Sequence, residues 1–132
     1  MRASLEKGWH VSTEPLIAVI DDDEPCRTAI SESLSVSGYR AHSFASADEF
    51  FAAGEEDAYH CIITDIHMPG MSGIDLKKLL VARGCEVPVI MITARTEPGL
   101  EAMAVECGAV CLLRKPFQTG ALTGHIENAI RI

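Results

Sequence analysis

Five polar side chains stand at or just beyond the ends of short apolar runs, and their types could support phosphoryl chemistry. They are Asp21, Asp22, Asp65, Thr93 and Lys115. Clustered carboxylates suit Mg²⁺, a cation that prefers oxygen ligands, keeps several waters and accepts an anionic substrate oxygen. A carboxylate next to such a cation can act as the nucleophile toward phosphorus. A hydroxyl and an ammonium group could then bind the phosphoryl oxygens, because phosphoryl transfer depends on positioning and charge neutralisation.

Each of these residues, taken alone, also has an ordinary structural interpretation. Asp65 could cap the Pro- and Gly-rich turn that follows it, and residues 21–23 could favour the dipole at the start of a helix. Thr93 could end a strand, and Lys115 could be a surface lysine. His67 has no second histidine at metal-ligand spacing, which argues against zinc. The interpretation as a site therefore depends on whether the fold brings these side chains together.

The apolar runs alternate with segments of helical periodicity, which predicts an α/β fold with a parallel sheet covered by helices on both faces. Strands are expected at residues 16–20, 39–44, 61–64, 87–92 and 110–113. Helices are expected from Asp23 or Glu24 to Gly38, from a capping-box pattern at 46–49, from Ser72 to Gly84, at 100–107 and at 118–130. Because the carboxyl ends of parallel strands lie on one edge of the sheet, the five polar side chains are expected to converge there.

The length of 132 residues predicts one domain. Residues 15–132 carry the alternating pattern and are expected to form it. Residues 1–14 carry mixed charge and no clear period, so we expect an N-terminal arm, either native or added to the chain. No residues remain after Ile132 for a DNA-binding or catalytic domain, so we expect either a single-domain protein or a piece of a longer one.

Charge and cysteine usage narrow the function classes. The formal net charge of -8 argues against binding of this domain to nucleic acid or to an anionic membrane. The five cysteines are odd in number and show no C-x-x-C spacing, so neither a disulfide framework nor a zinc ribbon is indicated. A cytoplasmic location is expected from free cysteines. No stretch resembles a signal peptide or is long and apolar enough to cross a bilayer.

The same residues resemble the receiver domain of two-component response regulators over nearly all of the chain from Pro15 onward. The resemblance rests on Asp21-Asp22, Asp65 with Met68-Pro69-Gly70, Thr93-Ala94 and Lys115-Pro116-Phe117. Two further segments, residues 70–73 and 108–110, are most similar to receivers joined to helix-turn-helix regulators. The resemblance implies a doubly wound, flavodoxin-like sheet of five parallel strands in the order 2-1-3-4-5. It also implies a phosphoacceptor that is not an enzyme beyond its own phosphorylation and dephosphorylation.

The resemblance further implies roles for the acidic residues. Asp65 would accept a phosphoryl group from a histidine kinase or a histidine phosphotransfer protein. Asp22 and Asp65 would hold Mg²⁺ together with the backbone carbonyl of His67, and Asp21 would act mainly through a bound water. A phosphorylation-dependent homodimer is a further expectation of the family.

Basic, polar and backbone groups would complete the site by the same resemblance. Thr93 and Lys115 would bind the phosphoryl oxygens, helped by the backbone N–H groups of Ile66 and Ala94. The peptide bond before Pro116 is expected to be cis.

Three positions around these residues, Leu112, His67 and Arg95, bear on switching and on hydrolysis of the acyl phosphate in the family. Leu112 stands where most receivers carry Tyr or Phe, so the aromatic half of the usual switch is absent and Thr93 would have to act alone. His67 and Arg95 lie two residues beyond Asp65 and Thr93, at positions that tune hydrolysis of the acyl phosphate in the family.

Two other functions compete with the phosphoacceptor. The segment Asp21-Asp22-Asp23 has the D-x-D spacing of haloacid-dehalogenase-type phosphatases, with Asp21 as nucleophile, but Pro25 stands where Thr or Val is usual. That alternative also leaves Asp65 unexplained. The second competitor is a receiver that acts as a scaffold without phosphorylation, which Leu112 alone favours.

Overall fold

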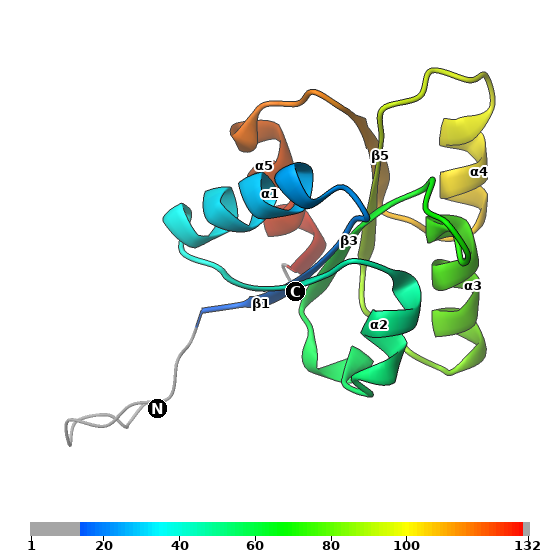
Figure 1. Cartoon of the computed structure of the whole chain (residues 1–132), viewed down its shortest axis with the longest axis horizontal. Coiled ribbons are helices and arrows are strands. Elements are labelled where there is room, and N and C mark those ends of the chain that lie inside the picture. Colours follow the sequence, from blue (N-terminus) through cyan, green and yellow to red (C-terminus); the bar gives the residue numbers. More distant parts are fainter. Residues whose placement is uncertain (1–13, 131–132) are drawn as a thin grey trace.

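Five strands form one parallel sheet at the centre of the molecule (Figure 1). The computed structural model describes residues 14–130, so the expected arm lies almost wholly outside the described residues. The strands are β1 (Leu16–Ile20), β2 (Arg40–Phe44), β3 (Cys61–Asp65), β4 (Val89–Thr93) and β5 (Cys111–Arg114). Their order is β2-β1-β3-β4-β5. The predicted fold class and strand order are confirmed. Strand β1 has the predicted bounds, and each of the other four strands is shifted by one or two residues at one end or both.

Helices connect successive strands, as right-handed parallel crossovers require. They are α1 (Glu24–Val36), α2 (Ala47–Ala52), α3 (Gly73–Ala82), α4 (Leu100–Glu106) and α5 (Thr119–Ile130), with a short 3₁₀ turn at Glu56–Ala58. Helices α1 and α5 cover one face of the sheet, and α2, α3 and α4 cover the other (Figure 1). Among the described residues, no helix is long and apolar enough to span a membrane.

The central strands are apolar on both faces because both faces are covered. Side chains of β1 alternate between two cores: Ala18 and Ile20 pack toward α2, α3 and α4, whereas Ile17 and Val19 pack toward α1 and α5. Every residue of β1, β3 and β4 is buried. This buried central layer fixes where each of these strands ends, and therefore where the site residues emerge.

Side-chain caps begin the helices next to the site. The Asp23 carboxylate accepts the Cys26 N–H at the start of α1, as predicted for one of the two candidates. A reciprocal capping box joins Ser72 and Asp75 at the start of α3. At α2 only half of the predicted box forms, because Glu49 accepts the N–H of Ala45 and not that of Ser46.

Candidate functional site

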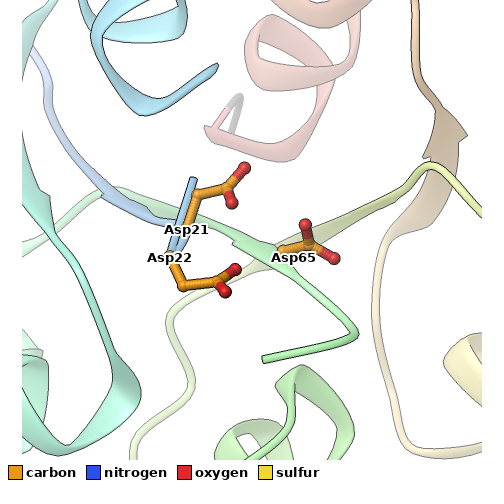
Figure 2. Close-up of side chains that lie close together, drawn as sticks. All are labelled: Asp21, Asp22 and Asp65. Carbon is orange, nitrogen blue, oxygen red and sulfur yellow. The ribbon is translucent and has the colours of Figure 1, made fainter. Parts of the chain in front are cut away.

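Three carboxylates meet where β1 and β3 end side by side. Strand β1 pairs with β3 up to Ile20 and Thr64, so the residues that follow are neighbours. Figure 2 shows Asp21 and Asp22 leaving β1 beside Asp65 at the end of β3. One carboxylate oxygen from each of the three lies within 4.8 Å of the others. The predicted convergence of these residues is therefore present in the structure.

The ammonium group of Lys115 joins two of these carboxylates. Its Nζ donates to Asp21 Oδ2 and to Asp65 Oδ2, each at 2.9 Å. Strand β5 brings it there, since the Lys115 N–H donates to the carbonyl of Thr93 at 2.8 Å. Burial by itself would lower the pKa of Lys115, but the hydrogen bonds and charges of Asp65 and Asp21 outweigh burial and raise it. Lys115 is therefore positively charged at neutral pH, and its bond to Pro116 is cis, as expected.

Both oxygens of Asp65 have defined partners. Oδ2 binds Lys115, and Oδ1 accepts the backbone N–H of His67 at 3.0 Å. The N–H of Ile66, predicted to face the phosphoryl group, instead donates to the carbonyl of Ile92 at 2.9 Å. That donor belongs to the sheet ladder, because β3 is still paired with β4 at this point. His67 supplies the backbone donor at the carboxylate.

The donor set fits a hard divalent cation. Asp21 is fully buried and Asp65 nearly so, whereas Asp22 is exposed. Among the residues that the structure describes, Asp22 has no hydrogen bond or ion pair, so its carboxylate is available as a ligand. Three carboxylates and one ammonium leave an excess of negative charge, which a cation would neutralise. Oxygen ligands of this kind suit Mg²⁺.

Comparison with known families identifies the chain. The model of the response regulator receiver domain matches residues 17–127. The chain belongs to the receiver-domain family. Receiver domains are phosphorylated by histidine kinases, generally bind Mg²⁺ at an acidic pocket and generally are not enzymes in the usual sense. This membership does not favour the phosphatase alternative with Asp21 as nucleophile.

Individual relatives agree with the family match. The receiver is 35% identical over 121 residues to the transcriptional regulatory protein FixJ of Bradyrhizobium diazoefficiens, covering 92% of this chain and 59% of that protein. It is 34% identical over 119 residues to the C4-dicarboxylate transport transcriptional regulatory protein DctD of Rhizobium meliloti, covering 90% of this chain and 26% of that protein. The chain thus spans only part of the length of these relatives.

A solved structure shares the architecture of the receiver. The crystal structure of FixJ-N superimposes with a TM-score of 0.82 at 29% identity, covering 89% of this chain and 94% of that one. This similarity over most of the chain supports the flavodoxin-like arrangement.

Thr93, at the end of β4, is fully buried, and its hydroxyl has two neighbours. The Arg95 N–H donates to Thr93 Oγ1 at 3.0 Å, and His67 Nδ1 lies 3.3 Å from the same oxygen. Glu97 continues the network, with one oxygen 3.6 Å from His67 Nε2 and the other 3.1 Å from the Arg95 guanidinium. The two predicted tuning positions, His67 and Arg95, are thus linked through a carboxylate.

Leu112 lies in the middle of β5, paired with Met91 of β4. It is partly buried and packs against the core between the sheet and α2, α3 and α4. No aromatic ring is available at this position to change between inward and outward orientations. The prediction that Thr93 acts without an aromatic partner stays a prediction.

Three residues of the site were missed by sequence reasoning. Glu97 contacts both predicted tuning residues, His67 and Arg95. The sequence could have indicated it, because Thr93, Arg95 and Glu97 are polar residues at every second position of a short loop. Arg114 pairs with Thr93 in the β4–β5 register, and its guanidinium donates to the carbonyl of Arg95. Gly73 lies against the backbone of Asp65, and its position at a helix start gave no indication of that contact.

Proposed function

We propose that this receiver accepts a phosphoryl group on Asp65 from a phosphohistidine of a histidine kinase or a histidine phosphotransfer protein. The observation that carries the proposal is the Asp65 carboxylate, held by Lys115 at 2.9 Å beside Asp21 and Asp22 at the carboxyl-terminal edge of the sheet. An orienting ammonium, neighbouring carboxylates and a nucleophilic oxygen are what phosphoryl transfer requires.

In the proposed reaction an oxygen of Asp65 attacks phosphorus as the bond between phosphorus and the donor imidazole nitrogen breaks. The leaving imidazole keeps the electron pair of that bond, and the product is an aspartyl phosphate. Lys115 orients the carboxylate and offsets the charge of the incoming phosphoryl group. The hydroxyl of Thr93 and the backbone N–H groups of His67 and Ala94 are proposed donors to its oxygens.

Asp22, Asp65 and the backbone carbonyl of His67 would hold Mg²⁺, and Asp21 would act through a bound water. When bound, the ion would neutralise part of the charge on the carboxylates and on the phosphoryl oxygens. Asp21 suits an indirect role because one of its oxygens already binds Lys115 and the other accepts the Asp23 N–H at 3.0 Å. The receiver would catalyse only its own phosphorylation and dephosphorylation.

The proposed output is a change in protein contacts. Phosphorylation would shift the receiver between two states that differ in their affinity for a partner or for a second copy of the receiver. Residues 15–132 would form this unit, with residues 1–14 as an arm, and nucleic acid would not be bound through it. Five free cysteines suit a reducing cytoplasm.

Phosphorylation with acetyl phosphate and Mg²⁺, followed by intact-mass measurement, tests the proposal. The wild-type chain should gain one phosphoryl group, and Asp65→Asn should gain none. Asp48→Asn, the same change on the exposed start of α2, should behave as wild type. Equal phosphorylation of Asp65→Asn and wild type would overturn the assignment of Asp65.

A further inference from the structure

A chain of polar contacts ties the loop after β4 to the loop after β3. The loop after β4, residues 94–99, leads from Thr93 to α4 and contains Arg95 and Glu97. Glu97 contacts residues of both loops, because one carboxylate oxygen faces His67 Nε2 at 3.6 Å and the other binds Arg95 at 3.1 Å. His67 in turn faces the hydroxyl of Thr93 through Nδ1 at 3.3 Å.

The hydrogens in this chain can be assigned from their neighbours. Thr93 Oγ1 accepts the N–H of Arg95, so its own proton is free to be donated to His67 Nδ1. Nδ1 accepts that proton only in the tautomer that carries its hydrogen on Nε2. The carboxylate of Glu97 beside Nε2 favours this tautomer. In this arrangement Thr93 donates to His67 Nδ1, and the Nε2–H faces the Glu97 carboxylate at 3.6 Å, a separation at which the attraction is electrostatic.

This arrangement uses the only proton that the Thr93 hydroxyl has. A hydroxyl donates one hydrogen bond, so Thr93 cannot bind His67 Nδ1 and a phosphoryl oxygen at the same time. Binding of a phosphoryl group on Asp65 by Thr93 would therefore require the contact with His67 to break. The contact favours the unphosphorylated arrangement by whatever free energy it contributes.

A second tether fixes the other side of the same loop. Arg114 lies opposite Thr93 in the β4–β5 register, and its guanidinium donates to the backbone carbonyl of Arg95. The loop is thus held at its side chains by Glu97 and at its backbone by Arg114. On its open side lies a groove lined by His67, Arg95 and Glu97, so these side chains can separate without displacing the core.

We infer that Glu97 is a positioning residue that holds the loop after β4 in its resting arrangement, with the Thr93 hydroxyl engaged by His67. The inference rests on the proposed function, because the resting arrangement matters only if Asp65 accepts a phosphoryl group. Loss of the Glu97 carboxylate frees the His67 ring, releases Thr93 and favours the phosphorylated arrangement. Glu97 thereby opposes activation without touching the reacting atoms.

The test compares Glu97→Ala with Glu101→Ala, the same change at an exposed position in the first turn of α4. The first readout is the affinity for beryllofluoride, a mimic of the phosphoryl group, in the presence of Mg²⁺. Exposed ion pairs are weak, so Glu97→Ala should bind beryllofluoride about two- to fivefold more tightly than wild type. Glu97→Gln keeps a polar oxygen facing His67, so its affinity for beryllofluoride should lie between that of wild type and that of Glu97→Ala. Glu101→Ala should match wild type.

The second readout needs neither metal nor phosphoryl mimic. Nitrogen NMR of the His67 ring in the metal-free protein should show the Nε2–H tautomer in wild type and Glu101→Ala, and a mixture of tautomers in Glu97→Ala. Unchanged affinity and an unchanged tautomer in Glu97→Ala would overturn the inference, as would weaker binding of beryllofluoride. Failure of the wild type to bind beryllofluoride in an Asp65-dependent manner would instead overturn the proposed function.

Discussion

Gly73 lies directly against the backbone carbonyl of Asp65. A Cβ atom added at Gly73 would overlap that carbonyl oxygen and stand 3.1 Å from the Cα of Ile66. The N–H of Gly73 also donates to the carbonyl of Ile66 at 2.9 Å, which closes the loop between β3 and α3. The first residue of α3 therefore sets the position of the proposed phosphoacceptor, and it has to be small because of space and not because of its backbone angles.

Gly73→Ala should lower the free energy of unfolding by about 1–3 kcal/mol, the usual cost of forcing an extra carbon into a packed site. The matched control is Gly124→Ala, in the interior of α5, where an added Cβ meets nothing within 4 Å. That change should stabilise the protein by up to about 1 kcal/mol, because alanine favours a helix more than glycine does. Urea unfolding of both variants measures the difference, and equal stabilities would show that the loop yields freely.

Lys115→Met should destabilise the unphosphorylated protein by about 2 kcal/mol, because it leaves the buried Asp21 and Asp65 carboxylates without their ammonium partner. Lys78→Met, on the exposed face of α3, is the control and should have little effect. The destabilisation should be smaller with Mg²⁺ present, since a cation would replace part of the missing charge.

The destabilisation caused by Lys115→Met should depend on pH. The pKa of Lys115 is raised on folding, so its contribution to stability is fully present below the unfolded pKa of about 10.4 and is lost as pH rises through the folded value. The stability difference between wild type and Lys115→Met should therefore be constant between about pH 7 and pH 9 and shrink above about pH 10.4. A difference that shrinks already below about pH 9 would contradict the raised pKa.

Asp22→Asn should stabilise the metal-free protein and weaken its binding of Mg²⁺. Without Mg²⁺ the loss of one of three clustered negative charges should raise the free energy of unfolding by up to about 1 kcal/mol, because like charges repel. Mg²⁺ affinity should fall at least about tenfold, as expected for loss of a ligand. Calorimetric titration measures the affinity, with Asp48→Asn as control. Unchanged Mg²⁺ affinity in Asp22→Asn would exclude Asp22 from the metal site.

Cys61 should resist alkylation in the folded protein. Burial in β3 raises the pKa of its thiol to about 12, so almost no reactive thiolate exists at neutral pH. The unfolded thiol ionises near pH 8.5, so this residue's contribution to stability is present below that pH and declines above it. Iodoacetamide labelling followed by peptide mass spectrometry should find Cys61 unmodified until urea unfolds the chain, while the partly exposed Cys107 reacts first. Rapid labelling of Cys61 without denaturant would contradict the prediction.

The sequence by itself determined the fold and the five polar side chains at the strand ends, namely Asp21, Asp22, Asp65, Thr93 and Lys115. Hydrophobic periodicity is local, and the handedness of parallel crossovers places every strand's carboxyl end on one edge, so Asp21, Asp65 and Lys115 had to converge. Strand and helix ends were off by one or two residues, because end positions depend on ladder bonds and caps that neighbouring elements decide.

Tertiary structure decided which groups touch. The register of β3 against β4 gives the N–H of Ile66 to Ile92 and leaves that of His67 facing Asp65. Loop conformation brings Glu97 to His67 and Gly73 to Asp65, contacts that join segments with no periodic relationship in the chain. Pattern and spacing report what each segment prefers by itself, whereas these contacts depend on side-chain rotamers and on the path of two loops packed against each other. The chemistry of the site could therefore be predicted from the residue types, whereas its resting arrangement is determined only by the folded chain.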